Sequence, residues 1–361
     1  MQHNPDQPPS TPRRHVRAAL LVCAWLIGAL TALHRPALAQ QDAVLPWPAW
    51  NAAQVREALP PLNASRSAPP SAAVTAYFKY YGLDIAGFDH RFGTFRSGPF
   101  TLAAHLFTPA RPRATVLLLH GYLDHSGTHT KAIRHLLEQG FAVAAYDLPG
   151  HGLSSGTRAD IRDFSDYSTA FVDFLRLCRE SMPPPYHVVA HSTGAAIVSS
   201  ALLANPDIAL DQVVLLAPLV RSAFWHLSTV AAAVFDPFID EIPRVFRNNS
   251  SDPTFIDFTR RDPLQPDRTT IDWLQAIAAW NKRVKTYPPS PKAIVIIQGD
   301  EDSIIDWDYN LAFLKDKFPN ARVEMVATGQ HQLLDESPAL QRHVLDLIDA
   351  ALSAGEMRPP R

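Results

Sequence analysis

The alternation of two residue patterns from residue 114 onward constrains the fold of this chain more than any other feature. "ATVLLLHGY" (114–122) and "FAVAAYDLPG" (141–150) are continuous apolar runs, which are typical of strands buried on both faces of a sheet. "HTKAIRHLLEQG" (129–140), between them, has helical spacing and ends in a glycine. The alternation continues with helix patterns at 165–181 and 193–205 and strand patterns at 186–192 and 211–220. This order predicts an α/β fold with a mostly parallel, doubly wound sheet.

The alternation is interrupted between residues 219 and 290. This stretch contains scattered aromatic residues and many prolines but no pattern of a buried strand, and it is too long for an ordinary loop. We therefore expect an inserted cap, or lid, over residues 219–290. Strand patterns return at 293–302 and 321–331, and an amphipathic helix follows from residue 337. The core is accordingly predicted to comprise residues 76–218 and 291–355.

The first 39 residues have the composition of an export signal peptide. Arginines at positions 13, 14 and 17 precede an uncharged, mostly apolar run over 18–33, and Ala37-Leu38-Ala39 offers a cleavage site with small residues at its first and third positions. The apolar run is shorter than the roughly 20 residues that a membrane span needs. We therefore expect an exported protein, periplasmic or secreted, with a signal of bacterial type. A chain anchored in the membrane by an uncleaved N-terminal segment is the alternative.

Composition excludes some classes of function. The chain has 361 residues, of which 47% are hydrophobic, so that it can bury a large core. Its formal net charge of −2 argues against the basic footprint of a nucleic-acid-binding protein. Of the two cysteines, Cys23 lies in the signal and Cys178 would remain alone, so no intramolecular disulfide is expected. Residues 40–75, rich in Pro and Ala, are interpreted as a linker or an extended segment on the surface.

A candidate nucleophile, Ser192, lies in "VVAHSTGA", where a predicted strand meets a predicted helix. A serine on such a tight turn projects its hydroxyl from the backbone, and the start of the helix presents unpaired N–H groups. Ala190 stands where the usual G-x-S-x-G pattern has glycine, a tolerable change of one methyl group if φ there is negative. The backbone N–H groups of Tyr122 and Thr193 are the candidate oxyanion hole. Because Tyr122 would act through its backbone, its side chain is expected to be unimportant.

The base and the acid are expected on the loops after the last two strands. His331 follows the final strand pattern and is the candidate base. Four aspartates compete for the role of acid: Asp300, Asp302, Asp306 and Asp308. Asp302 is preferred over Asp300 because it lies three residues past Gly299, far enough around the turn to face the histidine loop. The order Ser192, Asp302, His331 along the chain is the one that a serine hydrolase with this sheet requires.

Taken together, these motifs resemble the α/β-hydrolases of the monoacylglycerol lipase and lysophospholipase type, the serine aminopeptidase S33 group. The resemblance covers about residues 90–350 and rests on "LLLHGYLDHSG", "YDLPGHGLSSGTRADIRDF", "VVAHSTGA", "RRDPL", "IIQGDEDSIID" and "ATGQHQLLDE". It implies an α/β-hydrolase fold and a triad of Ser192, Asp302 and His331. It also implies an oxyanion hole at Tyr122 and Thr193, with His125 and Ser126 supporting the loop beside it. The implied chemistry is acyl transfer, for which no cofactor and no metal is expected.

The apolar and aromatic side chains of the cap either line an acyl-chain pocket or pack the cap onto the core. We expect a serine hydrolase that cleaves carboxylic esters, namely lipid esters such as monoacylglycerols or lysophospholipids, with transient contact between the cap and a membrane surface. One alternative is an S33-type peptidase, in which Asp240 or Glu241 would hold a substrate amine. The other is a non-catalytic hydrolase-fold binding protein. No nucleic-acid partner is expected, and the sequence leaves the oligomeric state open.

Overall fold

The computed structural model describes residues 50–62, 69–226 and 239–354. The predicted export signal at 1–39 lies outside these ranges, as do the beginning of the 40–75 segment and residues 227–238 of the cap. None of the helices in the described ranges has the length and the apolar character that crossing a membrane requires.

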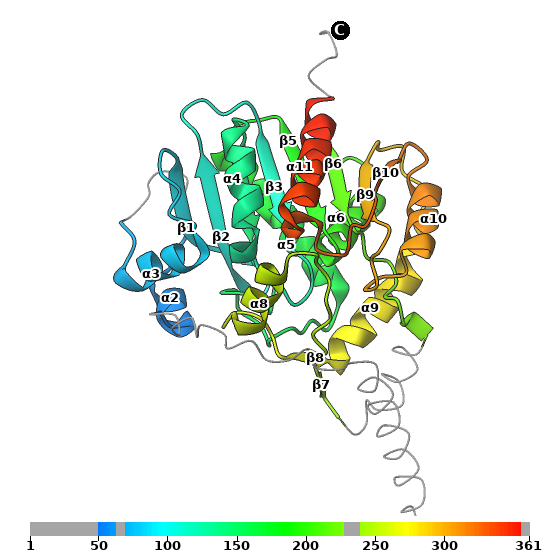
Figure 1. The fold of residues 1–361 in the computed structure, drawn as a ribbon, viewed down its shortest axis with the longest axis horizontal. Coiled ribbons are helices and arrows are strands. Elements are labelled where there is room, and N and C mark those ends of the chain that lie inside the picture. The colour runs from blue at the N-terminus through cyan, green and yellow to red at the C-terminus, as the bar shows by residue number, and fades with distance from the viewer. Residues whose placement is uncertain (1–49, 63–68, 227–238, 355–361) are drawn as a thin grey trace, which may run out of the picture. The chain divides into compact units, whose positions relative to one another are not determined.

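A sheet with the strand order β1-β2-β4-β3-β5-β6-β9-β10 forms the centre of the described chain (Figure 1). β2 pairs antiparallel with β1 and with β4, and all the other neighbours in this sheet are parallel. The strands are β1 (Asp89–Ser97), β2 (Phe100–Thr108), β3 (Thr115–Leu119), β4 (Ala142–Tyr146), β5 (Tyr186–His191), β6 (Val213–Leu216), β9 (Val295–Gly299) and β10 (Arg322–Val326). The prediction of a mostly parallel α/β sheet is confirmed.

Helices cover both faces of this sheet, which explains why its central strands are apolar throughout. In Figure 1, α4 and α11 lie in front of the sheet, whereas α5 and α6, which contact each other, lie behind it. The helices around the sheet are α4 (Thr130–Glu138), α5 (Phe164–Ser181), α6 (Thr193–Ala204), α10 (Trp307–Lys317) and α11 (Pro338–Ser353).

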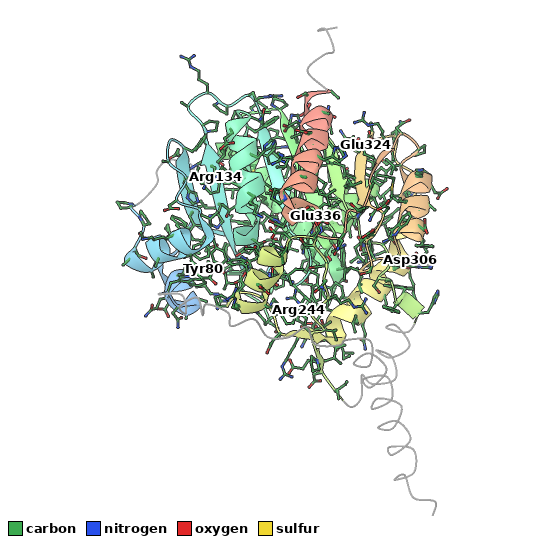
Figure 2. All side chains as sticks on the ribbon, viewed as in Figure 1. Tyr80, Arg134, Arg244, Asp306, Glu324 and Glu336 are labelled. Carbon is green, nitrogen blue, oxygen red and sulfur yellow. The ribbon has the colours of Figure 1, made fainter. Side chains whose placement is uncertain are left out.

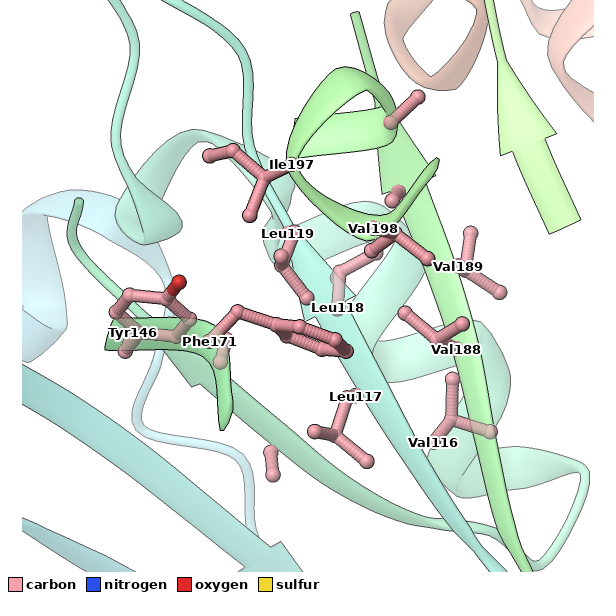
Figure 3. Packing of buried hydrophobic residues seen from close by; sticks show 14 of the residues in the cluster. Val116, Leu117, Leu118, Leu119, Tyr146, Phe171, Val188, Val189, Ile197 and Val198 are labelled. Carbon is pink, nitrogen blue, oxygen red and sulfur yellow. The ribbon is translucent and has the colours of Figure 1, made fainter. Parts of the chain in front are cut away.

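The central strands and the helices behind them share one apolar core. β3 and β4 are buried along their whole length, and Figure 3 shows Val188 and Val189 of β5 in the same cluster as Ile197 of α6. Such close-packed interiors resist deformation. The loops at the carboxyl ends of β3, β5 and β9 therefore start from rigid points, which matters for the polar residues that they carry.

The N-terminal segment packs onto the sheet from Trp50 onward. α2 (Ala52–Ala58) and α3 (Ala72–Tyr81) lie beside β1, and the ring of Trp50 meets that of Tyr77 edge-on with 5.3 Å between centroids. Residues 60–62 follow the outer edge of β1, where Leu62 N–H donates to the carbonyl of Thr94 and Thr94 N–H donates to that of Pro60. This segment thereby covers an edge strand that would otherwise present unpaired backbone groups.

The described part of the cap contains two helices and a short two-stranded sheet. These elements are β7 (Glu241–Pro243), α8 (Pro253–Arg261), β8 (Arg268–Thr270) and α9 (Ile271–Val284). β7 and β8 pair antiparallel, and β7 is exposed along its length. The cap approaches the sheet at the end of β5, since residues of α8 and α9 line the same cavity as Ser192.

Candidate active site

Ser192 stands between the last residue of β5, His191, and the first residue of α6, Thr193. Its backbone has φ +51° and ψ −112°, a conformation that residues with side chains rarely adopt and that the surrounding fold must maintain. α6 approaches the end of β3 so closely that a Cβ at Gly194 would lie 2.7 Å from the carbonyl oxygen of His120. Ser192 therefore occupies a sharp, strained turn that presents its hydroxyl.

Ala190, which replaces the usual glycine, fits into β5 without strain. It does not have a positive φ, and it is fully buried beside Leu119 of β3 and Leu215 of β6. Its methyl group is fully enclosed where β5 ends, so a larger side chain would displace its surroundings, including the turn that follows.

We expect Ala190→Leu to lower the free energy of unfolding by about 1–3 kcal/mol through overpacking. We also expect this variant to lose most of its turnover, because the displaced turn carries Ser192. Urea unfolding and an esterase assay measure the two effects, and Ala190→Gly is the matched control that should keep its activity. Unchanged turnover in the leucine variant would contradict the assignment of this turn.

The three residues of the predicted triad form one hydrogen-bonded chain. His331 Nε2 lies 3.0 Å from Ser192 Oγ, and His331 Nδ1 lies 2.8 Å from Asp302 Oδ2. All three side chains are buried. Asp302 also accepts hydrogen bonds from Gln298 Nε2 and from the backbone N–H of Ile304. The serine can thus lose its proton to a histidine whose ring orientation the carboxylate determines.

The ionisation of Asp302 follows from these contacts. Burial would raise the pKa of its carboxyl, but the charge and hydrogen bond of His331 and the N–H of Ile304 outweigh burial and keep the pKa below its ordinary value. The carboxylate is therefore charged at neutral pH and can stabilise a protonated His331.

Two of the other aspartates near β9, Asp300 and Asp306, have structural partners. Asp300 Oδ1 accepts a hydrogen bond from the backbone N–H of Thr328, 2.7 Å away. Asp306 caps the N-terminus of α10 through the N–H of Tyr309. Of the two aspartates weighed for the acid, Asp302 is the one whose carboxylate lies against His331.

The candidate oxyanion donors flank Ser192. Thr193 is the first residue of α6, where backbone N–H groups have no partner within the helix. On the other side, a Cβ at Gly121 would lie 3.1 Å from Cβ of Ser192, so the loop after β3 lies against the serine. Tyr122 follows this glycine and lines the cavity that Ser192 and His331 also line.

The side chain of Tyr122 corrects one sequence expectation, because it makes contacts that matter for the cap. Its ring stacks on Trp273 of α9 with 3.6 Å between centroids, and its hydroxyl donates to the carbonyl of Ala159. The sequence treated this side chain as unimportant because a backbone donor does not depend on it. In the structure, it joins the candidate oxyanion loop to the cap.

Two further histidines hold the loops in place. His191 Nε2 lies 2.9 Å from the carbonyl oxygen of His331, so it acts as the donor to that carbonyl. Burial lowers the pKa of His191 to about 3, which keeps it neutral beside the candidate base. His120 accepts at Nε2 from the N–H of Leu148, which places its proton on Nδ1, next to the carbonyl of Gly121.

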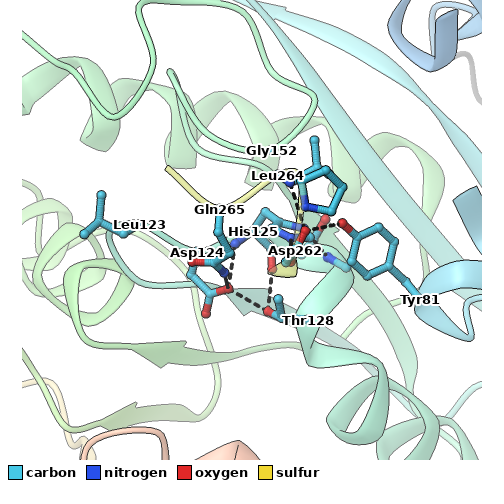
Figure 4. Close-up of polar contacts among 12 residues, drawn as sticks. Tyr81, Leu123, Asp124, His125, Thr128, Gly152, Asp262, Leu264 and Gln265 are labelled. Carbon is cyan, nitrogen blue, oxygen red and sulfur yellow. Dashed lines mark hydrogen bonds and ion pairs between the residues drawn. The ribbon is translucent and has the colours of Figure 1, made fainter. Parts of the chain in front are cut away.

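A buried clamp joins the cap to the core (Figure 4). Asp262, in the "RRDPL" segment of the cap, lies 2.8 Å from His125 Nε2 and accepts a hydrogen bond from the hydroxyl of Tyr81. The side chains of Asp262 and His125 are fully enclosed. Burial disfavours the charged form of His125, but Asp262 outweighs this effect and raises the pKa of His125 above its ordinary value. His125 was expected only to support its loop, whereas the structure gives it a partner in the cap.

Removing the clamp charge with Asp262→Asn should lower the free energy of unfolding by about 3 kcal/mol or more near pH 6. A histidine whose folded pKa is raised contributes stability below its ordinary pKa of about 6.5, and this contribution is lost as pH rises through the folded value. The stability of the wild type should therefore fall over that pH window, and the variant should lack this fall. Urea titrations at several pH values test this, with the exposed Asp267→Asn as control; parallel pH profiles would contradict the clamp.

A cavity of about 240 Å³ opens beside Ser192 and His331. Much of its wall is apolar and comes from both core and cap, with Leu219, Phe255, Ile256, Trp273, Ile304 and Ile305. Among the described residues that line it there is no Asp or Glu, whereas Arg244, Arg247 and Arg260 are present. Figure 2 shows Arg244 in the cap, at the level of α8 and α9. In the described ranges, no group of three His, Cys, Asp or Glu side chains is arranged to hold a metal ion.

The sheet order, the turn at Ser192 and the inserted cap define an α/β-hydrolase fold. The family described as serine aminopeptidase, S33 matches residues 110–338, and the chain belongs to this family.

The individual relatives have low sequence identity to this chain. The chain is 25% identical over 245 residues to a monoglyceride lipase homolog of Monkeypox virus, a match that covers 66% of this chain and 88% of that protein. It is 23% identical over 275 residues to a probable lysophospholipase L2 of Haemophilus influenzae, covering 69% and 87%. A soluble variant of the monoglyceride lipase of Saccharomyces cerevisiae, solved with a substrate analogue, has the same fold, with a TM-score of 0.63 at 16% identity over 75% of this chain and 97% of that one.

Proposed function

We propose that the protein is a serine hydrolase that cleaves carboxylic esters through an acyl-enzyme. The observation that carries this proposal is the hydrogen-bonded chain from Ser192 through His331 to Asp302, which opens into a cavity covered by the cap. Membership of the S33 family and relatives named as lipases support it.

In the proposed reaction, Ser192 Oγ attacks the ester carbonyl while His331 Nε2 takes its proton, and Asp302 stabilises the imidazolium. The backbone N–H groups of Tyr122 and Thr193 stabilise the negative charge on the tetrahedral intermediate, each by about 3 kcal/mol. The carbon–oxygen bond to the alcohol then breaks, and His331 returns the proton to the leaving oxygen. Water attacks the acyl-enzyme by the same steps and releases the carboxylic acid and free Ser192.

The proposed substrates are esters of single-chain lipids, such as monoacylglycerols or lysophospholipids. The apolar wall of the cavity favours an acyl chain, and relatives named monoglyceride lipase and lysophospholipase support this class. Turnover of glycerol monoesters with acyl chains of 2 to 18 carbons tests the proposal on the purified chain. Rates that rise with chain length are expected, and activity confined to acetyl esters would contradict a lipid substrate.

The S33 description raises a peptidase as the second candidate. A site for a substrate amine needs a carboxylate, and no Asp or Glu lines the described part of the cavity. Glu241, one of the sequence candidates, pairs instead with Arg268 at 2.8 Å on the two-stranded sheet of β7 and β8. These observations favour the ester over the peptide as substrate.

We also propose that the cap makes transient contact with a membrane surface. Large apolar side chains are exposed on or beside the described part of the cap: Phe224, Ile239, Ile242 and Val245. Exposed apolar side chains favour such contact where they form a patch, and these four belong to the cap. Replacing Ile239 and Ile242 by Asp should reduce co-sedimentation with phosphatidylcholine vesicles, whereas Met325→Asp, exposed on β10, should not. Equal losses in both variants would contradict a contact through the cap.

Export remains a proposal that rests on residues 1–39. Fractionation of bacteria that express the full chain, followed by mass measurement, tests it. A periplasmic or secreted form that begins at Gln40 is expected. A full-length membrane form would favour the anchor, and a full-length cytosolic form would contradict both.

A further inference from the structure

We propose that the cap arginines Arg244 and Arg247 form a subsite for an anionic group on the alcohol portion of the ester. This inference rests on the proposed ester hydrolysis and specifies its substrate class: single-chain acyl esters whose alcohol carries a phosphate or a carboxylate. Neutral glycerol esters would then be the poorer substrates.

The first argument is the charge of the cavity. Arg244, Arg247 and Arg260 line it together with Ser192, and no Asp or Glu does so among the described residues. Arg260 lies 4.0 Å from Asp257 on the same helix, so the subsite is assigned to the other two arginines. This local excess of positive charge contrasts with the net charge of −2 for the whole chain. A cleft lined by one sign of charge concentrates ligands of the opposite sign.

The second argument is that the guanidinium of Arg244 keeps donors free. Its Nη1 donates to Gln265 Oε1 at 2.6 Å and to the carbonyl oxygens of Pro266 and Leu123. Within the described chain, its Nε and Nη2 have no hydrogen-bond partner, and neither is a buried unpaired atom, so both remain accessible. A guanidinium that is held by one nitrogen and open at the others suits two-point binding of a phosphate or carboxylate.

The third argument is position. Arg244 contacts the carbonyl of Leu123, the residue after the candidate oxyanion donor Tyr122. Arg247 donates to the carbonyl of Ser303, the residue after Asp302, at 3.3 Å. The two arginines are thus anchored to the two loops that carry the reacting groups. Because Arg244, Arg247 and Ser192 line the same cavity, an anion bound by the arginines suits a short alcohol, such as glycerol, whose ester carbonyl is at Ser192.

The buried carboxylates behind the cavity do not neutralise these arginines through direct contact. Asp124 accepts from Gln265 and faces His129 at 3.6 Å, and Asp262 is occupied by His125 and Tyr81. In the described chain, neither Arg244 nor Arg247 has a carboxylate oxygen within 4.0 Å. Among the described residues, no ion pair therefore occupies either guanidinium, and the groups that lie against them are aromatic rings, Phe246 at 4.4 Å from Arg244 and Phe224 at 4.8 Å from Arg247.

The test compares kcat/KM for four hexanoyl esters below their micellar concentrations: those of glycerol, glycerol 3-phosphate, glycerophosphocholine and glyceric acid. The kcat/KM for the hexanoyl ester of glycerol 3-phosphate is expected to exceed that for the ester of glycerol by about tenfold or more, which is the usual effect of a charge-assisted contact. The glyceric acid ester distinguishes a carboxylate from a phosphate as the preferred anion. The ester of glycerophosphocholine, in which the choline cation neutralises the phosphate, shows whether the advantage in kcat/KM over the glycerol ester is then lost.

The ratio of kcat/KM for the phosphate and glycerol esters should fall about tenfold in Arg244→Gln and also in Arg247→Gln. The second variant leaves the contact of Arg244 with the oxyanion loop intact. Arg268→Gln, whose arginine pairs with Glu241 outside the cavity, is the matched control and should keep the ratio. An enzyme that hydrolyses all four esters equally, or variants that retain the wild-type ratio, would overturn the subsite while leaving ester hydrolysis intact.

A binding measurement separates the subsite from catalysis. Calorimetry on Ser192→Ala should detect salt-sensitive binding of glycerol 3-phosphate, and Arg247→Gln should abolish it. If no ester is hydrolysed but this binding occurs, the proposed function fails and the anion subsite stands. If no binding occurs, the subsite is wrong whatever the esterase activity.

Discussion

Ser192→Ala is expected to reduce kcat for ester hydrolysis by about 10⁴- to 10⁶-fold. The hydroxyl of Ser192 lies 3.0 Å from His331 Nε2, so its loss removes the atom that would form the acyl-enzyme in the proposed reaction. The residual rate should be the one that the oxyanion donors and substrate binding provide alone. Steady-state turnover of the preferred ester measures the loss.

Covalent labelling by a fluorophosphonate probe gives an independent readout of the same variant. The wild type should be labelled, and Ser192→Ala should not. Ser199→Ala is the matched control, because Ser199 lies in α6 and its hydroxyl donates to the carbonyl of Ala195. A folded wild type that resists the probe would favour the non-catalytic binding protein over the hydrolase.

Asp302→Asn should reduce kcat by about 10⁴-fold with little change in the fold. The asparagine occupies the same volume, but it carries no charge to stabilise the imidazolium and can favour the wrong tautomer of His331. The 2.8 Å contact from Asp302 Oδ2 to His331 Nδ1 is the one that changes. Turnover and a thermal unfolding curve together separate the loss of catalysis from a loss of stability.

Asp300→Asn is the matched control for this prediction. Asp300 lies two residues earlier in the same loop, is exposed, and accepts a hydrogen bond from the backbone N–H of Thr328. Its replacement should leave kcat within about twofold of the wild type, as is usual for surface substitutions. If the two variants exchanged their effects, the acid would be Asp300 and the assignment from geometry would be wrong.

The fold could be predicted from the sequence because the residue patterns that specify its strands and helices are local. Apolar runs such as 115–119 and 142–146 are continuous only when helices cover both faces of a strand, and these runs became β3 and β4. The interruption at 219–290 was equally local, since no run there has the pattern of a buried strand. The packing of Trp50 against Tyr77 was not visible in the Pro- and Ala-rich segment, because a tertiary contact, not a pattern, buries it.

The sequence by itself determined the α/β class, and it predicted a tight turn at Ser192 and the order of serine, acid and histidine along the chain. These follow from periodicity, from glycine at positions of close approach and from the fixed connection of parallel strands. The tertiary structure alone decided the rest. It paired His125 with Asp262 across 137 residues, stacked Tyr122 on Trp273, and brought Arg244 and Arg247 into the cavity of Ser192. Such contacts join side chains that are distant along the chain, and their distances and burial arise only when the cap lies on the core.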